Sequence, residues 1–358
     1  MGRKIGNFEG LIIVPMILLA GLSLAIIGSI SPQLVMMQAS FFGVGFVVFF
    51  LLTFIDNDIF KSLAWPLYIA ALLFLGLSFF GTSIRGATRW IEIGSLQIQP
   101  SELVKPFLVI VQATFLSRYP PKSFTQIAFF LGLFFIPFFL VFRQPDLGNS
   151  VIYLGTMLGL LYIAGIPGRY IVGFLGIFTI LLPILWGAIK DYQRLRMITF
   201  FNPYLDMGGA GYNAIQAMIA VGSGHLFGRG LGRGPQSQLR FLPENHTDFI
   251  FASLTEELGF LAAIMLLISY FILLLQLLRV GREGSSDFGQ LVAFGAFIQL
   301  FLHVVINIGM NLGLLPITGI TLPLVSYGGS SILATFILLG LVHSEVMRIK
   351  RHKTIAIG

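Results

Sequence analysis

The sequence of 358 residues lacks cysteine and is short of charge, since only 10% of its residues are Asp, Glu, Lys or Arg. Without cysteine the chain forms no disulfide and no thiolate-bound metal site. Its five histidines are scattered and form no pair at metal-ligand spacing. Soluble domains carry about 25% charged residues, so this chain has too little charge for a surface that faces water.

Hydrophobic residues take the place of charge, at 56% of the chain with a mean hydropathy of +0.91. A membrane-spanning helix needs about 20 apolar residues. The segments that approach this length are residues 9–30, 34–55, 62–81, 101–117, 124–142, 147–165, 170–189, 249–278, 288–310 and 325–347. The first is too long for a cleavable signal, so we expect an uncleaved helix. We predict an all-α polytopic membrane protein with about ten transmembrane helices and a single membrane domain over residues 1–358.

The basic residues predict how the chain is oriented, because inner loops are enriched in Lys and Arg. With the N-terminus inside, the inner segments hold Arg3, Lys4, Lys61, Arg118, Lys122, Arg169, Arg279, Arg282, Arg348, Lys350, Arg351 and Lys353. Fewer basic residues then lie outside, most of them in one long loop. We therefore expect both termini to be cytoplasmic. We read the net charge of +7 as anchoring at an anionic membrane face and not as nucleic-acid binding.

Two outer segments are unusual for simple connections. Residues 82–100 mix charged side chains with Trp90 and isoleucine. Residues 190–248, just before the eighth span, are far longer than a connector requires. This long extracytoplasmic loop contains an apolar stretch, residues 212–224, that is too short to span a membrane. We predict an interfacial or re-entrant helix there.

Charged residues inside apolar segments are costly and usually have partners. Glu102 and Lys105 are spaced i, i+3 and share one helix face. They form either a structural ion pair at the membrane edge or a charged wall of an outward-facing cavity. Ser101 is a candidate N-cap of the same helix. Asp146 either caps the sixth span or pairs with Lys105 across helices.

Residues 241–260, FLPENHTDFIFASLTEELGF, hold the densest group of titratable side chains: Glu244, His246, Asp248, Glu256 and Glu257. Asp248 lies where the loop becomes a span. Either Thr247 or Asp248 caps the helix, or Asp248 is a general base at the outer membrane edge. Glu256 lies roughly 12 Å further along the helix and about 80° round it. We expect it and Glu257 to have partners.

Two further segments break regular helix. The glycine-rich residues 222–234 lack the Lys-Ser/Thr ending of a phosphate loop, so they do not predict a nucleotide site. Glycine there allows tight backbone folding, and Arg229 and Arg233 could meet phosphate. Residues 314–332 contain Pro316, Pro323 and small residues such as Ser326. They serve either close helix packing or the site.

Several of these segments match a known family in order along the chain. The matching blocks are GATRWIEIGSLQIQPSELVK (86–105), RQPDLGNS (143–150), IQAMIAVGSGHLFGRGLG (215–232), LPENHTDFIFASLTEELGF (242–260) and NLGLLPITGITLPLVSYGGSS (311–331). The chain resembles the SEDS family (shape, elongation, division and sporulation) over nearly its whole length. The short N-terminus and SQLRFLPE resemble the RodA branch more than the FtsW branch. Thr321 departs from the proline of many RodA sequences.

The resemblance implies a multi-pass protein of the bacterial cytoplasmic membrane. Such a protein polymerises lipid II into peptidoglycan glycan strands at the outer face, by inverting glycosyl transfer, for cell shape and elongation. A class B penicillin-binding protein is the implied partner, besides membrane lipids. Asp248 matches the essential aspartate of the family, and Glu102, Lys105 and Asp146 match its charged cavity residues. Glu256 matches an acidic position often named beside the aspartate.

The same reading assigns further roles in binding. The remaining candidate substrate-binding residues are Arg89, Trp90, Glu244, His246, Glu257 and Ser326. The substrate pyrophosphate is expected to meet Lys105 first, with Arg194, Arg196 and Arg229 as weaker candidates. A divalent cation, Mg²⁺ or Mn²⁺, could share this task, although no metal ligand is assigned. No organic cofactor is expected.

Two other functional classes remain open for such a chain. A lipid II flippase or transporter would use buried charge and broken helices, but transporters often show half-repeats and midplane charges. We find no such repeat, and the acidic cluster lies near one face. A scaffold of the cell-wall synthesis complex would not need Asp248. These observations favour an enzyme.

Overall fold

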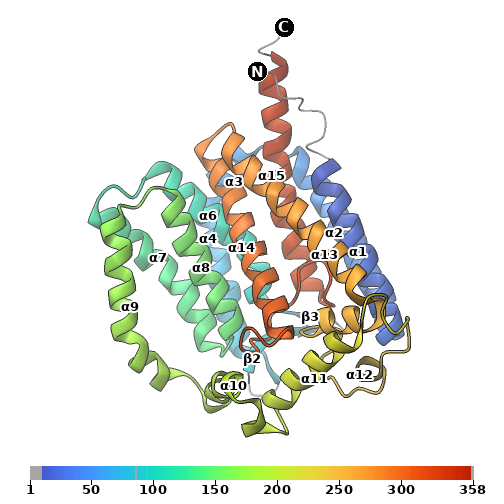
Figure 1. The fold of residues 1–358 in the computed structure, drawn as a ribbon. Helices are drawn as coiled ribbons and strands as arrows, with labels where there is room; N and C mark the ends of the chain where they lie inside the picture. Colours follow the sequence, from blue (N-terminus) through green and yellow to red (C-terminus); the bar gives the residue numbers. More distant parts are fainter. Residues whose placement is uncertain (1–9, 85–86, 95, 356–358) are drawn as a thin grey trace.

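The computed structural model describes residues 10–84, 87–94 and 96–355 as a bundle of helices (Figure 1). Each of the ten predicted spans coincides with a helix in this part of the chain. These helices are α1 (Gly10–Ile30), α2 (Val35–Phe54), α4 (Ala64–Leu77), α6 (Lys105–Arg118), α7 (Phe124–Arg143), α8 (Leu147–Ile163), α9 (Gly168–Ala188), α13 (Ile250–Glu283), α14 (Asp287–Asn311) and α15 (Gly329–Ile355). The predicted fold class is confirmed. Two basic residues used for orientation, Arg3 and Lys4, lie outside the described residues.

Length and composition support membrane insertion for much of this bundle. Among the described residues, α1, α2, α7, α13, α14 and α15 are long and apolar enough to cross a membrane. Residues 64–80 and α8 form shorter apolar helices. The protein is therefore a multi-pass membrane protein.

The remaining elements are short. The connections near the spans contain η1 (Pro32–Leu34), α3 (Asn57–Ser62), η2 (Ser78–Phe80) and α5 (Pro100–Leu103). The long segment 190–248 contains α10 (Asp191–Phe201), η3 (Pro203–Asp206), α11 (Ala210–Ser223) and α12 (Pro235–Gln238). The predicted short helix of residues 212–224 thus corresponds to α11, which ends one residue earlier.

The two ends of the bundle differ in what covers them (Figure 1). At one end lie α3 and the short connections 119–123, 164–167 and 284–286, and α15 projects beyond them. We call it the short-turn end. At the other end lie α10, α11, α12 and the sheet, which we call the loop end. Placing all the long connections at one end makes room there for a site.

A small antiparallel sheet at the loop end was not predicted. Its strands are β1 (Thr82–Ile84), β2 (Ala87–Ile93) and β3 (Leu96–Ile98), in the order β1-β2-β3. Ile91 pairs with Ile98, and Ile93 pairs with Leu96. Isoleucine, threonine and tryptophan favour strands, which explains why this charged segment is not helical. The sheet brings Arg89 and Trp90 of β2 to the loop end.

Helix α14 occupies a central place in the bundle, because it contacts α6, α8, α13 and α15. Other helices of the bundle also pack closely, and small residues allow this. At Gly45 of α2, an added Cβ would lie only 2.4 Å from the Phe336 ring of α15. Glycine at this position therefore lets α2 and α15 approach closely.

Helix α13 is broken at Gly259, whose φ of 78° and ψ of −174° are not helical. The glycine-rich run 222–234 packs against this break. The backbone N–H of Phe260 donates to the carbonyl of His225 over 2.9 Å, and an added Cβ at Gly259 would lie 2.2 Å from the Gly228 nitrogen. The run is thus a packing partner that satisfies freed backbone groups, which explains its glycines.

Candidate functional site

A cavity of about 580 Å³ opens at the loop end of the bundle. It is lined by residues of β2, α5, α10, the segment before α13 and the loop before α15. Its ionisable lining residues are Arg89, Glu102, Tyr192, Arg196, Glu244, His246, Asp248 and Tyr327. Among the predicted site residues, Arg89, Trp90, Glu102, Glu244, His246 and Asp248 are therefore brought together.

Asp248 lies at the cavity wall just before α13. The N-cap of α13 is Phe249, and no side chain caps the helix there. The capping alternative for Thr247 or Asp248 is therefore wrong. The Asp248 carbonyl accepts hydrogen bonds from Asn307 Nδ2 at 3.0 Å and Asn311 Nδ2 at 3.1 Å. Two side chains of α14 thus fix the backbone from which the carboxylate projects.

Arg196 of α10 lies beside Asp248 at the turn formed by Gly319. An added Cβ at Gly319 would lie 3.4 Å from Asp248 Oδ2 and 3.7 Å from Arg196 Nη1. The φ of Gly319 is +72°, a conformation that favours glycine. Burial lowers the pKa of Arg196, and the Asp248 carboxylate opposes that shift. The turn therefore keeps space open where opposite charges face the cavity.

Asp146 supports the cavity wall without lining it. It is the N-cap of α8, accepting from the Asn149 backbone N–H at Oδ1, so the capping prediction is confirmed. Its Oδ1 also lies 3.3 Å from Arg89 Nη1, so the partner is Arg89 and not Lys105. Burial would raise the pKa of Asp146, but the Arg89 guanidinium and the Asn149 hydrogen bonds outweigh it and lower the pKa.

Ser101 is not the N-cap that the sequence suggested. Helix α5 begins at Pro100 with Gln99 as its N-cap. The Ser101 hydroxyl instead donates to Asp146 Oδ2 over 3.2 Å, and Gln99 Nε2 donates to the same oxygen over 2.9 Å. The start of α5 is thereby tied to the start of α8.

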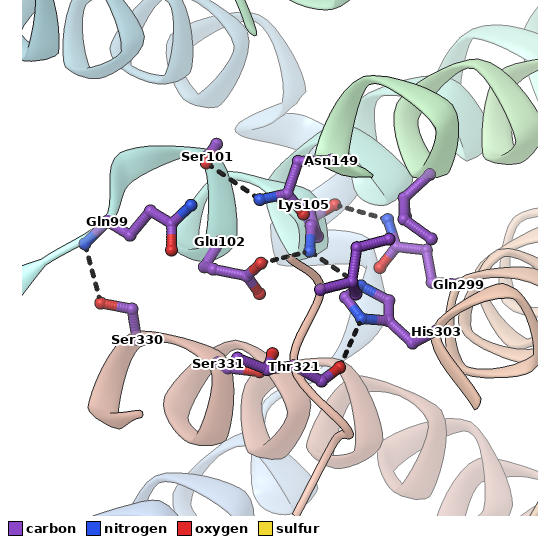
Figure 2. A network of polar contacts seen from close by, with 12 residues as sticks. Gln99, Ser101, Glu102, Lys105, Asn149, Gln299, His303, Thr321, Ser330 and Ser331 are labelled. Atoms are coloured by element: carbon purple, nitrogen blue, oxygen red, sulfur yellow. Dashed lines mark hydrogen bonds and ion pairs between the residues drawn. The ribbon is translucent and has the colours of Figure 1, made fainter. Parts of the chain in front are cut away.

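Glu102 and Lys105 form the predicted i, i+3 pair, with 2.8 Å between Lys105 Nζ and Glu102 Oε1 (Figure 2). Glu102 lines the cavity, whereas Lys105 is only 3% exposed and lies beneath it. Lys105 Nζ also lies 2.8 Å from His303 Nε2, and His303 Nδ1 lies 3.2 Å from the Thr321 carbonyl. The lysine is therefore held inside the protein by Glu102 and His303 and does not line the cavity.

Glu256 and Glu257 are fully buried outside the cavity. Glu256 accepts from the backbone N–H groups of Gln236 and Ser237, both over 2.9 Å. Glu257 accepts from the Ser29 hydroxyl over 2.5 Å and from Gln238 Nε2 over 2.7 Å. The expectation of partners is confirmed. The structure uses both carboxylates to hold segment 232–238 and does not place them at the cavity.

Ser326 is likewise engaged within the protein. Its hydroxyl donates to the Thr247 carbonyl over 2.6 Å and accepts from the Leu322 N–H over 2.8 Å. The neighbouring Tyr327 N–H donates to the His246 carbonyl over 2.8 Å. The loop before α15 therefore holds the segment that carries Asp248, and Ser326 is not among the cavity-lining residues.

The three weaker candidates for binding pyrophosphate, Arg194, Arg196 and Arg229, lie in different parts of the structure. Arg196 lines the cavity, but Arg194 lies outside it and pairs with Asp191 at 3.4 Å. Arg229 lies in the glycine-rich run, where its backbone N–H donates to the Glu256 carbonyl over 2.9 Å. Only Arg196 of these three is placed to meet a ligand in the cavity.

Sequence reasoning missed a set of polar residues on α14: Gln299, His303, Asn307 and Asn311. A signal for them was present in the sequence. They recur every fourth residue in a mostly apolar helix, which places them on one face. Polar groups in a membrane helix usually mark a function or a partner.

No group of three His, Cys, Asp or Glu residues that could hold a metal ion occurs in the described residues. The cavity instead offers separate carboxylates, two arginines and polar side chains. The fold and the site together define a multi-pass membrane protein with a charged cavity at one end of its bundle.

Comparison with known families agrees with this class. The family described as cell cycle protein, which comprises FtsW, RodA and SpoVE, matches residues 8–354. The chain therefore belongs to this family, the SEDS family, and the resemblance inferred from five sequence blocks is confirmed.

Relatives and solved structures match over most of the chain. The peptidoglycan glycosyltransferase MrdB of Escherichia coli K12 is 40% identical over 303 residues, which cover 84% of this chain and 82% of MrdB. The probable peptidoglycan glycosyltransferase FtsW of Geobacter metallireducens is 35% identical over 304 residues, covering 83% and 80% of the two chains.

Two solved structures share the fold. A chain of a peptidoglycan synthase complex that coordinates polymerization and crosslinking has a TM-score of 0.84 and 32% identity, covering 95% of this chain and 98% of that one. The rod shape determining protein RodA of Thermus thermophilus has a TM-score of 0.71 and 30% identity, covering 94% and 96%.

Proposed function

We propose that this protein is a peptidoglycan glycosyltransferase that polymerises lipid II into glycan strands at the outer face of the bacterial cytoplasmic membrane. We assign it to cell shape and elongation. The observation that carries the proposal is that the Asp248 carboxylate and the Arg196 guanidinium both lie near the Gly319 turn and line a 580 Å³ cavity at the loop end. The relatives named as peptidoglycan glycosyltransferases support the reaction class.

Asp248 acts as the general base in this proposal. The acceptor 4-hydroxyl oxygen attacks the anomeric carbon of the donor sugar, and Asp248 takes the hydroxyl proton. The bond from that carbon to the pyrophosphate oxygen breaks, and the polyprenyl pyrophosphate leaves with the bonding electron pair. One displacement inverts the anomeric centre. A single carboxylate is enough, because the leaving group needs little protonation.

Arg89 and Arg196 are the cavity cations that would bind the pyrophosphate. Guanidinium groups hold phosphate oxygens in a bidentate geometry. Asp146 orients Arg89 through the 3.3 Å contact, and Lys105 acts from beneath the cavity by holding Glu102. Trp90, Glu244 and His246 supply polar and aromatic surface for the sugars.

A divalent cation would fit this cavity only with the help of the substrate. Mg²⁺ in proteins is commonly held by one or two carboxylates together with substrate phosphates. Glu244, four residues before Asp248, is the cavity carboxylate that would hold the cation, and the pyrophosphate would complete the ligand set. When bound, Mg²⁺ or Mn²⁺ would neutralise charge on the leaving group.

The orientation follows from charge and from exposed apolar residues. We place the loop end outside, because the short-turn end carries the basic residues that favour the cytoplasm, and both termini are then cytoplasmic. Helix α11 exposes Met218 and Ile219, as a helix at the membrane interface does. The loop 190–248 then covers the outer cavity, and a class B penicillin-binding protein receives the strands for crosslinking. No nucleic acid is involved.

The test is lipid II polymerisation in detergent by purified wild type and Asp248→Asn, each with and without a penicillin-binding partner and with Mg²⁺ or Mn²⁺. Loss of a general base typically costs 10²- to 10⁴-fold in rate, so we expect the variant to make no detectable strands. Asp191→Asn makes the same chemical change on an exposed side chain outside the cavity, and its activity should match wild type.

The outcomes separate the proposal from its alternatives. Polymerisation that survives Asp248→Asn removes this residue from the base role. No strands from wild type under any metal or partner condition would support a flippase, to be checked by lipid II transfer across vesicles. A scaffold would recruit its partners equally well with Asn at position 248.

A further inference from the structure

Helix α14 carries a row of buried polar side chains through the centre of the bundle. Gln299, His303, Asn307 and Asn311 are between 0% and 5% exposed and are spaced by four residues. We call this row the α14 polar ladder. Each buried polar group here would cost free energy if it lacked a partner. Each of the four contacts a part of the site on another element.

Asn307 and Asn311, the two members nearest the loop end, fix the start of α13. Asn311 Oδ1 accepts from the Ala252 N–H over 3.1 Å, and its Nδ2 donates to the Asp248 carbonyl over 3.1 Å. Because Phe249 has no capping side chain, Asn311 performs the capping role from a neighbouring helix. Asn307 Nδ2 donates to the same Asp248 carbonyl over 3.0 Å.

Gln299 and His303, the two members further from the loop end, contact Lys105 of the Glu102–Lys105 ion pair beneath the cavity (Figure 2). His303 Nε2 lies 2.8 Å from Lys105 Nζ, and Gln299 Nε2 donates to the Lys105 carbonyl over 3.4 Å. Because Lys105 carries three donors and no acceptor, the imidazole nitrogen that faces it is the acceptor. The other nitrogen, Nδ1, then donates to the Thr321 carbonyl over 3.2 Å.

The α14 polar ladder also holds the cavity wall between the Asp248 segment and the Glu102–Lys105 pair. Asn307 Nδ2 donates to the Ile320 carbonyl over 2.7 Å, and His303 binds the next carbonyl, that of Thr321. Both lie directly after Gly319, the turn that faces Asp248 and Arg196. The same helix face therefore contacts the base segment, the turn beside it and the ion pair.

We propose that the α14 polar ladder sets the position of the Asp248 carboxylate relative to the Gly319 turn and the Glu102–Lys105 pair. Its members are positioning residues that do not touch the reacting atoms. This inference rests on the proposed function, because it assigns a purpose to the placement of the base. At 1.5 Å per residue, one rigid helix sets a separation of about 18 Å between the outer members.

The positioning role predicts a loss in kcat with little change in KM. A displacement of about 1 Å of a reacting group can cost 100-fold in rate. Asn307→Ala and Asn311→Ala should each lower kcat at least tenfold per folded molecule, with KM for lipid II within threefold of wild type. Asn311→Asp keeps the acceptor for Ala252 and removes the donor to Asp248, so it should also lower kcat if the alanine variant does not fold.

Asn57→Ala is the matched control. Asn57 is a buried asparagine at the short-turn end, where its Nδ2 donates to Glu345 Oε2 over 3.1 Å. Its loss should lower the melting temperature as the other asparagine changes do, yet leave kcat within twofold. If the Asn307 and Asn311 variants also keep kcat within twofold while Asp248→Asn is inactive, the ladder is only structural and the inference fails.

A second measurement does not depend on polymerase activity. The chain has no cysteine, so Asp248→Cys introduces a single thiol at the site. Its reaction rate with a small methanethiosulfonate reagent reports how the side chain at position 248 is presented. Adding Asn307→Ala or Asn311→Ala should change that rate at least threefold, and adding Asn57→Ala should not. Unchanged rates would overturn the inference even if wild type proved to be no polymerase.

Discussion

The two ends of the bundle both bury charged side chains, but they surround them differently. At the short-turn end, Glu345 is fully buried and accepts from Asn57 Nδ2, from the Ser285 N–H and from the Ser285 hydroxyl. At the loop end, the partly exposed Asp248 and Arg196 face a cavity of about 580 Å³. A buried carboxylate by itself therefore does not mark a site.

The difference shows which acids line the cavity and which are enclosed by the protein. Glu256 lies at the loop end but resembles Glu345, because each carboxylate binds three donors of the protein. Such hydrogen bonds hold loops in place and leave little room for substrate. Asp248 instead has its backbone held by α14 while its carboxylate lies at the cavity wall.

The comparison can be tested most strongly with one arginine from each end. Arg196→Ala removes a cation that would stabilise the leaving pyrophosphate, so we expect kcat/KM to fall about 100-fold or more. Arg348→Ala at the short-turn end breaks partly exposed pairs with Asp56 and Asp58, and should leave kcat/KM within twofold. Steady-state lipid II polymerisation measures both. Equal losses would mean that the cavity arginine has no special role.

The second test concerns the acids that are held by internal donors. Glu256→Ala leaves the N–H groups of Gln236 and Ser237 without their acceptor, so we expect a loss of about 3 kcal/mol in stability. Glu345→Ala should cost a similar amount at the other end. Thermal unfolding in detergent gives both values, and limited proteolysis should cut segment 226–240 faster only in Glu256→Ala. A fully stable but inactive Glu256→Ala would contradict the structural role.

The smallest expected effect is a pH dependence of stability at Asp146. Because the pKa of this carboxyl is lowered below 3.8 in the folded protein, its stabilising contribution is complete above the unfolded pKa. It is lost as the pH falls through the folded pKa. The melting temperatures of wild type and Asp146→Asn should therefore differ by a constant amount at about pH 6 to 8, and this difference should shrink as the pH falls below about 4. A difference that grows as the pH falls would reverse the assigned sign.

Much of the fold could be predicted because the signal for a membrane-spanning helix lies in one continuous stretch of the sequence. A run of about 20 apolar residues is enough to identify a span, and all ten predicted spans are helices. The sheet of residues 82–98 escaped because its strands are short and lie in a segment of mixed charge. The break at Gly259 was not predicted because one glycine in an apolar run does not by itself indicate a non-helical conformation.

The site was predicted in part. Residue types identified Asp248, Glu102 and Arg89, which line the cavity, and the spacing of Glu102 and Lys105 gave their ion pair correctly. The same reasoning grouped Glu256 and Glu257 with Asp248, because charge density along the chain does not show which donors a carboxylate meets. It gave the capping role of Asp146 correctly, but the alternative pairing that it offered was with Lys105, since Arg89 comes from a strand that was not foreseen.

The sequence by itself determined the membrane class, the ten spans and the family, since these depend on hydrophobic length and on local motifs. Tertiary structure alone decided which charges face the cavity and which are held by internal donors. That choice depends on contacts between residues far apart in the chain, such as Asp248 with Asn307 and Lys105 with His303. Such contacts form only when the helices pack, because burial then forces each polar group to find a partner.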